Sequence, residues 1–192
     1  MGELFGFVLF FLSVMNISSS PYPLCLLLCY LVHETGHIFM AYLCKAEIRD
    51  FKMSLFRMKI RYDCTRLTYG RECLVCLGGV LFNFIFALIF SAPVFDFSDK
   101  ICFFVMCNIC LGLMNLYPVS ILDGGNALRC FLMMCSDEIK ASAISTCVSF
   151  VFAFILWLIS IYLQLVFSSD VSIFFISVFL LTQLCFSVGE RQ

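Results

Sequence analysis

The chain has 192 residues, of which 62% are hydrophobic and only 13% are charged, and its formal net charge is −1. A soluble domain of this length cannot bury so much apolar side chain, so the composition predicts an integral membrane protein without a second sizeable domain. The nearly neutral charge argues against nucleic acid as a partner and leaves the lipid bilayer as the expected surrounding.

The apolar segments predict an all-α polytopic membrane protein with about six transmembrane helices. A helix needs about 20 apolar residues to cross the hydrocarbon core, with ~17 as a practical minimum, so the first and fourth segments are short. The first could be a signal peptide, but Glu3 and the lack of Lys or Arg before the apolar run favour a membrane helix. The six predicted spans are Leu4–Asn16, Leu24–Cys44, Cys73–Ala92, Ile101–Leu116, Ala141–Phe167 and Val171–Val188.

Basic residues indicate the orientation. Eight of the twelve Lys and Arg residues lie in the segment 45–71. With six spans, Lys100 is the only one of the twelve on the opposite side of the membrane. The positive-inside rule makes the basic side cytoplasmic and predicts that both termini lie in the cytoplasm.

The segment Ile48 to Tyr69, between the second and third predicted spans, has a different pattern. Apolar and polar residues alternate with a period of two, slip by one position near Phe56 and then alternate again. This pattern indicates strands joined by a bulge or tight bend, so we expect a short membrane-associated β-hairpin between helices 2 and 3. Its apolar face would rest on lipid, or its edge would pair with an extended substrate, and the two interpretations are compatible.

The thirteen cysteines include two pairs with zinc-knuckle spacing, Cys73-x-x-Cys76 and Cys107-x-x-Cys110. Each pair lies in an apolar run without a loop that could fold around a metal ion. Cysteine packs as a small hydrophobic residue, and disulfides are rare in reducing compartments. We therefore interpret these cysteines as packing residues.

The chain's only two histidines stand four residues apart in His33-Glu34-Thr35-Gly36-His37, inside the second predicted span. On a helix this spacing places both imidazoles on one face, one turn apart, where they can bind one zinc ion. Glu34 then lies beside the water that the metal would hold. Ionisable residues within a span are costly and indicate function by default. Since His37 is about 12 Å along a helix from Lys45, we expect the site just below the cytoplasmic surface.

A catalytic zinc ion typically has three protein ligands and one open position. With no third histidine, Asp123 is the one carboxylate near the end of an apolar span on the same predicted side, beyond the helix-breaking Pro118. A nearby cysteine is an alternative ligand, although a thiolate would weaken the Lewis acid. By itself, Asp123 before Gly124 would be read as a helix N-cap.

The expected chemistry is the hydrolysis of a peptide bond with one Zn²⁺ per chain. Zinc lowers the pKa of a bound water to roughly 7, and Glu34 would accept the proton and deliver it to the leaving amine. A neighbouring amide, Asn115 or Asn83, would help to stabilise the oxyanion.

These motifs resemble the site-2 protease family of intramembrane zinc metalloproteases, and most of all its compact bacterial branch that includes the stage IV sporulation FB protease. The resemblance covers roughly residues 24–128. The first and third family elements match at every signature position, and the second departs only at Val80, where the family has proline. The matching segments are His33-Glu34-Thr35-Gly36-His37, Gly79-Val80-Leu81-Phe82-Asn83, and Asn115 with Pro118, Leu122, Asp123, Gly124 and Gly125.

The resemblance implies a single membrane-embedded metalloprotease domain over residues 1–192. Its catalytic core would span about residues 24–128, and its C-terminal helices about residues 141–188. The protein would be a multi-pass zinc metalloendopeptidase of the bacterial cell membrane. It would cleave a membrane-associated or membrane-spanning protein near the cytoplasmic face, as in regulated intramembrane proteolysis. The sequence carries no signal for the substrate's identity or for the oligomeric state.

Two other classes compete with this interpretation. A divalent-metal transporter can also carry His-Glu-x-x-His in a span, but it needs a continuous polar path, and the fifth and sixth predicted spans provide none. A non-catalytic membrane scaffold could retain the motif as a relic, but here the ligand set is intact.

Overall fold

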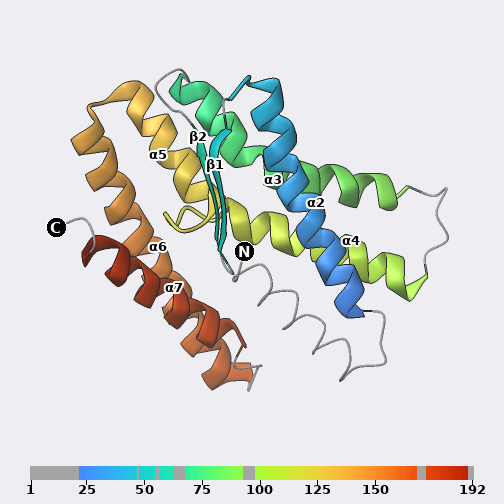
Figure 1. Cartoon of the computed structure of the whole chain (residues 1–192). Coiled ribbons are helices and arrows are strands. Elements are labelled where there is room, and N and C mark those ends of the chain that lie inside the picture. Colours follow the sequence, from blue (N-terminus) through green and yellow to red (C-terminus); the bar gives the residue numbers. More distant parts are fainter. Residues whose placement is uncertain are drawn as a thin grey trace. The chain divides into compact units, whose positions relative to one another are not determined.

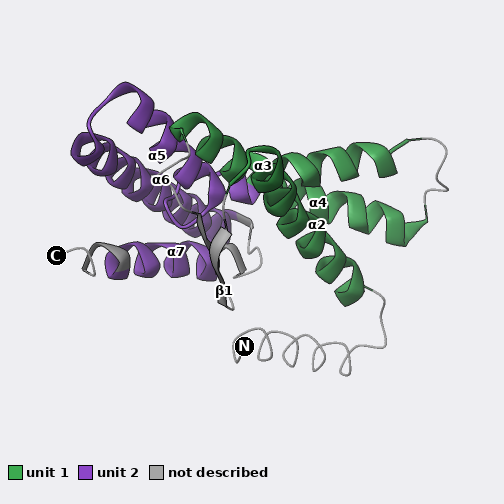
Figure 2. Cartoon of the chain, turned by 45° about the horizontal axis from the view of Figure 1, so that its top comes forward, with its two compact units in different colours: residues 1–113 green, residues 114–192 purple. Residues whose placement is uncertain are grey.

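The computed structural model describes residues 22–46, 48–54, 57–62, 68–92, 98–167 and 172–189. The chain divides into two compact units, residues 1–113 and 114–192, which are coloured separately in Figure 2. The single metalloprotease domain and its core over residues 24–128 stay predictions. The described elements, labelled in Figure 1, are α2 (Tyr22–Leu43), β1 (Ile48–Ser54), β2 (Arg57–Tyr62), α3 (Tyr69–Phe90), α4 (Asp99–Leu116), α5 (Asp123–Cys135), α6 (Glu138–Phe167) and α7 (Ser172–Gly189).

Four of the described helices are long and apolar enough to cross a membrane, namely α2, α3, α4 and, within α6, Glu138–Val166. The apolar part of α7, Phe174–Phe186, is shorter. These helices correspond to the predicted spans two to six and are consistent with a polytopic membrane protein. The first predicted span, Leu4–Asn16, lies outside the described residues.

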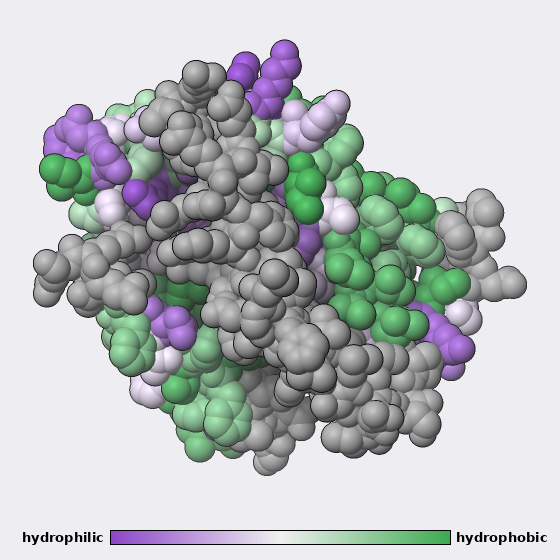
Figure 3. Space-filling model, in the orientation of Figure 1, coloured by the Kyte–Doolittle hydropathy of each residue, from purple (hydrophilic) through white to green (hydrophobic). Residues whose placement is uncertain are grey.

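The outer surface of these helices is apolar, as a helix in contact with lipid requires. In Figure 3 hydrophobic side chains gather over the side where α3 and α4 lie. Leu88 of α3 is 75% exposed, and other large apolar side chains exposed on the same helix are Leu74, Leu81, Ile85 and Ile89.

In the first unit, α2 and α3 pack with their backbones in contact. A Cβ atom added at Gly36 would collide with the carbonyl oxygen of Gly78, and one added at Gly78 would lie 2.7 Å from the carbonyl oxygen of Gly36. Small residues allow this approach, which is the usual way for membrane helices to gain packing contacts. The α4 helix joins through aromatic rings, with the centroids of Phe90 and Phe104 5.2 Å apart.

A two-stranded antiparallel ladder lies between α2 and α3 in the chain, in the segment where the sequence predicts a hairpin. The backbone register pairs Phe51 with Ile60 and Met53 with Met58, and it is irregular between Ile48 and Asp50. The predicted slip near residue 56 falls outside the described residues. The membrane association of this ladder stays a prediction.

The second unit is built on α6, which packs against both α5 and α7 (Figure 1). The buried residues Ala153, Leu180 and Leu184 form an apolar core together with Val119, which lies between α4 and α5 and is fully buried. The irregular segment that leads to α5 is therefore part of the core of this unit.

We predict that Gly78→Ala lowers stability by about 1–3 kcal/mol, because the new methyl group must displace the α2 backbone. Thermal unfolding in detergent micelles measures this effect. The matched control is Gly112→Ala in α4, where the added Cβ would lie 3.2 Å from ring atoms of Phe84, a side chain that can adjust. Equal stability of the two variants would contradict the proposed backbone constraint.

Candidate metal centre

The two imidazoles meet on one face of α2, as the four-residue spacing predicts. The Nε2 atoms of His33 and His37 are 3.2 Å apart, and the rings are nearly perpendicular, at 84°. Two nitrogens bound at about 2.0–2.1 Å to one tetrahedral zinc ion are roughly 3.3–3.4 Å apart. The pair therefore fits a shared ion.

A contact from α3 orients His37. Its Nδ1 atom lies 2.9 Å from the backbone carbonyl oxygen of Val75. Because a carbonyl oxygen can only accept a hydrogen bond, Nδ1 carries the proton and Nε2 keeps its lone pair. Metal-binding histidines are commonly held in this way.

Gly79 of α3 leaves the space that the imidazoles occupy. A Cβ atom at this position would lie 2.5 Å from Nε2 of His37 and 2.6 Å from Cε1 of His33. Gly79 belongs to the second motif of the resemblance, and its contact with the ring pair gives that motif a physical role.

Glu34 is also buried, with 9% of its surface exposed. The hydroxyl of Tyr30, one turn earlier on α2, donates a hydrogen bond to the Glu34 carboxylate. The Oε2 atom of Glu34 has no hydrogen-bond partner among the described residues. An unsatisfied buried carboxylate oxygen is unusual and points to a partner such as water. Tyr30 was not among the residues expected from the sequence, although its four-residue spacing from Glu34 was a usable signal.

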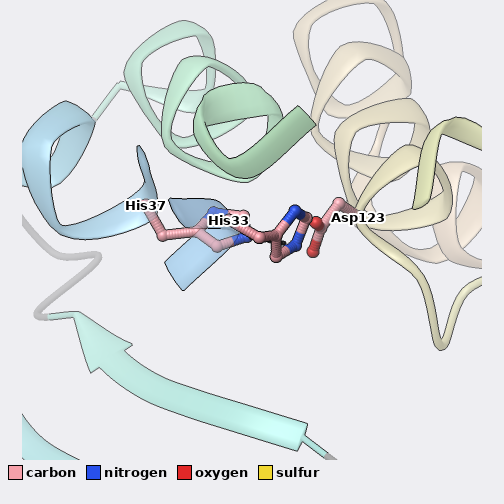
Figure 4. A group of neighbouring side chains, drawn as sticks. All are labelled: His33, His37 and Asp123. Carbon is pink, nitrogen blue, oxygen red and sulfur yellow. Dashed lines mark hydrogen bonds between the residues drawn. The ribbon is translucent and has the colours of Figure 1, made fainter. Parts of the chain in front are cut away.

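Asp123 lies in the second unit, at the start of α5. The α4 helix ends at Leu116, and α5 begins at Asp123 itself with Leu122 at the N-cap position, so the carboxylate is not the cap. A carboxylate in the first turn is favoured by the helix dipole. Figure 4 shows the Asp123 side chain at the start of this helix, together with the two imidazoles on α2.

The glycine pair after Asp123 allows the chain to fold back on itself. A Cβ atom at Gly124 would collide with the backbone of Leu116, and one at Gly125 would collide with the backbone of Val119. The start of α5 therefore packs directly on the irregular segment before it.

The two candidate amides differ in their surroundings. Asn83 of α3 is fully buried, and neither of its amide atoms has a hydrogen-bond partner within the described ranges. Asn115 is partly buried near the end of α4. A third amide, Asn108, is fully buried in α4 and donates to Cys29 Sγ at 3.1 Å and to the Phe104 carbonyl oxygen at 2.9 Å.

Comparison with known proteins supports a peptidase. Residues 95–159 match the model of Peptidase family M50, and this segment includes Asn115, Pro118 and Asp123. No curated protein sequence matches the chain.

Among solved structures, the chain is similar to the site-2 protease from Methanocaldococcus jannaschii. The similarity has a TM-score of 0.61 at 19% sequence identity and covers 93% of this chain and 84% of that chain. At this identity it shows the fold. The family match, the fold and the apolar helices together support an intramembrane metalloprotease.

We predict that Gly79→Ala lowers the zinc affinity at least about 10-fold, because the new methyl group displaces the imidazole nitrogens. Competition with a chromogenic chelator measures the affinity. The control is Gly112→Ala, which adds the same methyl group near the Phe84 ring. Unchanged affinity in Gly79→Ala would mean that the rings do not bind the metal in this position.

Proposed function

We propose that this protein is an intramembrane zinc metalloendopeptidase that cleaves a membrane-associated or membrane-spanning protein near the cytoplasmic face. The observation that carries this proposal is the arrangement on α2. Two imidazole nitrogens lie 3.2 Å apart, and the buried Glu34 carboxylate next to His33 in the chain has an oxygen without a hydrogen-bond partner in the part of the chain that the structure describes. This arrangement lies in a helix apolar enough to cross a membrane. Ionisable side chains within a membrane helix are costly and mark a functional site by default.

The proposed ligands of a single zinc ion are His33, His37 and Asp123. Each offers one ligand atom of a kind that could hold a metal ion, either an imidazole nitrogen or a carboxylate oxygen. Two imidazoles and one carboxylate suit zinc, and they leave a fourth position for water or substrate. The four-residue spacing, the Nδ1 contact of His37 and the helix-terminal position of Asp123 support this assignment.

When bound, zinc would acidify a water molecule and polarise the scissile carbonyl. Glu34 takes the proton of the attacking water on its Oε2 atom and passes it to the leaving amine. Tyr30 holds the same carboxylate by donating a hydrogen bond, which limits its rotation. Burial of Glu34 keeps bulk water away from this proton transfer.

An amide donor completes the proposed site. Asn83 or Asn115 would donate a hydrogen bond to the oxyanion that forms on the scissile carbonyl. A buried amide with unpartnered atoms costs stability, so the fully buried Asn83 is the assignment that the described contacts favour.

The finer features of the resemblance belong to the same proposal. These are the stage IV sporulation FB-like branch, residence in a bacterial cell membrane and cytoplasmic termini. Each strand of the β1–β2 ladder has an outer edge that pairs with no other described strand, and such an edge would suit pairing with an extended substrate.

We predict that Glu34→Gln abolishes cleavage, with a fall of about 10²–10⁴-fold or more, and leaves zinc binding intact, because the amide cannot accept the proton. The assay is cleavage of membrane peptides in proteoliposomes, with substrates found by comparing membrane fragments from cells with each variant. The control is Glu138→Gln, at a side chain that is 71% exposed. Retained cleavage in Glu34→Gln would contradict the role of Glu34.

We predict that Asp123→Ala lowers zinc affinity at least about 10-fold by removing a ligand, and that a chelator inhibits the wild-type protein reversibly. The control is Asp137→Ala, at a side chain that is 79% exposed and pairs with Lys140. Wild-type zinc affinity in Asp123→Ala would contradict the ligand set. Zinc uptake by proteoliposomes without cleavage would favour a transporter, and zinc binding with neither activity would favour a scaffold.

A further inference from the structure

The segment between α4 and α5 has an irregular backbone, and α6 supplies a hydrogen-bond acceptor for one of its N–H groups. The Ser120 N–H group donates a hydrogen bond to the hydroxyl oxygen of Ser149, at 2.9 Å. The Ser149 hydroxyl in turn donates to the carbonyl oxygen of Ser145, at 2.7 Å. Ser149 is fully buried. Its hydroxyl therefore connects the irregular segment to the α6 backbone.

A second contact holds the same segment. The hydroxyl of Tyr117 donates a hydrogen bond to the Phe152 carbonyl oxygen at 3.0 Å, and the two rings meet edge to face at 5.6 Å. With Val119 in the apolar core beside Ala153, α6 holds three nearby positions of the segment.

A short turn links the contacts of this segment with α6 to Asp123. The Leu122 N–H group donates to the Val119 carbonyl oxygen at 2.8 Å, so a tight turn spans Ser120 and ends beside Asp123. Gly124, the residue directly after Asp123, packs against the backbone of Leu116. Because both sides of Asp123 are held by these contacts, a shift of the Ser120 backbone also moves the Asp123 carboxylate.

We propose that Ser149 is a positioning residue for the zinc site, which sets the place of the Asp123 carboxylate through the Ser120 backbone. This inference rests on the proposed function, because it assumes that Asp123 is a ligand. The N–H groups of an irregular backbone at membrane depth need hydrogen-bond acceptors from the protein. The Ser149 hydroxyl on α6 is the acceptor for the Ser120 N–H group. Ser149 itself does not touch the metal or the substrate.

The test compares Ser149→Ala with Ser160→Ala in purified full-length protein. Ser160 is a matched control because it lies on the same helix and is 1% exposed. Its hydroxyl also bonds a helix carbonyl, that of Trp157, and lies 3.3 Å from the Ser177 hydroxyl, away from the α4–α5 segment. The measurements are zinc affinity by chelator competition, the visible spectrum of the cobalt(II)-substituted protein, and thermal unfolding in micelles.

We expect Ser149→Ala to weaken zinc binding about 10-fold or more and to change the cobalt(II) spectrum, whereas Ser160→Ala keeps the wild-type values. Ser149→Thr should restore both, since it retains the hydroxyl. If Ser149→Ala does not fold, Ser149→Cys carries the test: it keeps nearly the same volume but replaces the hydroxyl by a weakly bonding thiol, and it should weaken zinc binding in the same way.

Wild-type zinc affinity and cobalt(II) spectrum in folded Ser149→Ala or Ser149→Cys would overturn the proposal. An equal loss in Ser149→Ala and Ser160→Ala would also overturn it, because that result indicates a general effect on α6. Failure of the proposed ligand set is distinguishable, since in that case Asp123→Ala itself would bind zinc like the wild type. Failure of the proposed protease activity is distinguishable as well, since in that case the wild-type protein would bind zinc without cleaving membrane peptides.

Discussion

The close approach of α2 and α3 fixes the surroundings of His33 and His37, the two proposed zinc ligands on α2. Gly36 and Gly78 bring the two backbones into contact, and Gly79 leaves room for two imidazole rings. The same approach places the Val75 carbonyl oxygen 2.9 Å from Nδ1 of His37, which orients the ring. Polar side chains inside a membrane are tolerated only where such partners surround them. The packing of α2 against α3 therefore also sets the orientation of the His37 ring.

In the second unit, too, a polar group has a hydrogen-bond partner on a neighbouring helix, but there the polar group belongs to the backbone. The chain is irregular between α4 and α5, where Pro118 cannot continue the helix. The freed N–H group of Ser120 bonds to Ser149, and the apolar Val119 is buried in the core on α6. In both units, a polar group near a proposed ligand is paired with a neighbouring helix rather than with solvent. The pairing atoms are a backbone carbonyl in one case and a side-chain hydroxyl in the other.

The buried amides show how a structural polar group differs from a functional candidate. Asn108 is fully buried and donates to Cys29 and to a carbonyl of its own helix, so packing accounts for its amide nitrogen. Asn83 is equally buried, but neither amide atom has a hydrogen-bond partner among the described residues. Since an unsatisfied buried amide lowers stability, it needs a functional explanation more than Asn108 does. From the sequence, Asn83 was a candidate because of its motif, and Asn108 was not a candidate.

The helical membrane class, the pairing of His33 with His37 and the break after α4 could all be predicted from the sequence alone. These features depend on local rules, namely hydrophobic length, the 3.6-residue helical period and the missing N–H group of proline. Three features follow only from the packing of the folded chain: the carbonyl that orients His37, the need for glycine at position 79 and the hydrogen bond between Ser149 and Ser120. A serine in an apolar helix usually bonds its own backbone, so its spacing carries no sign of a second partner. Only the packing of distant segments reveals such a partner, because its position depends on how the helices meet.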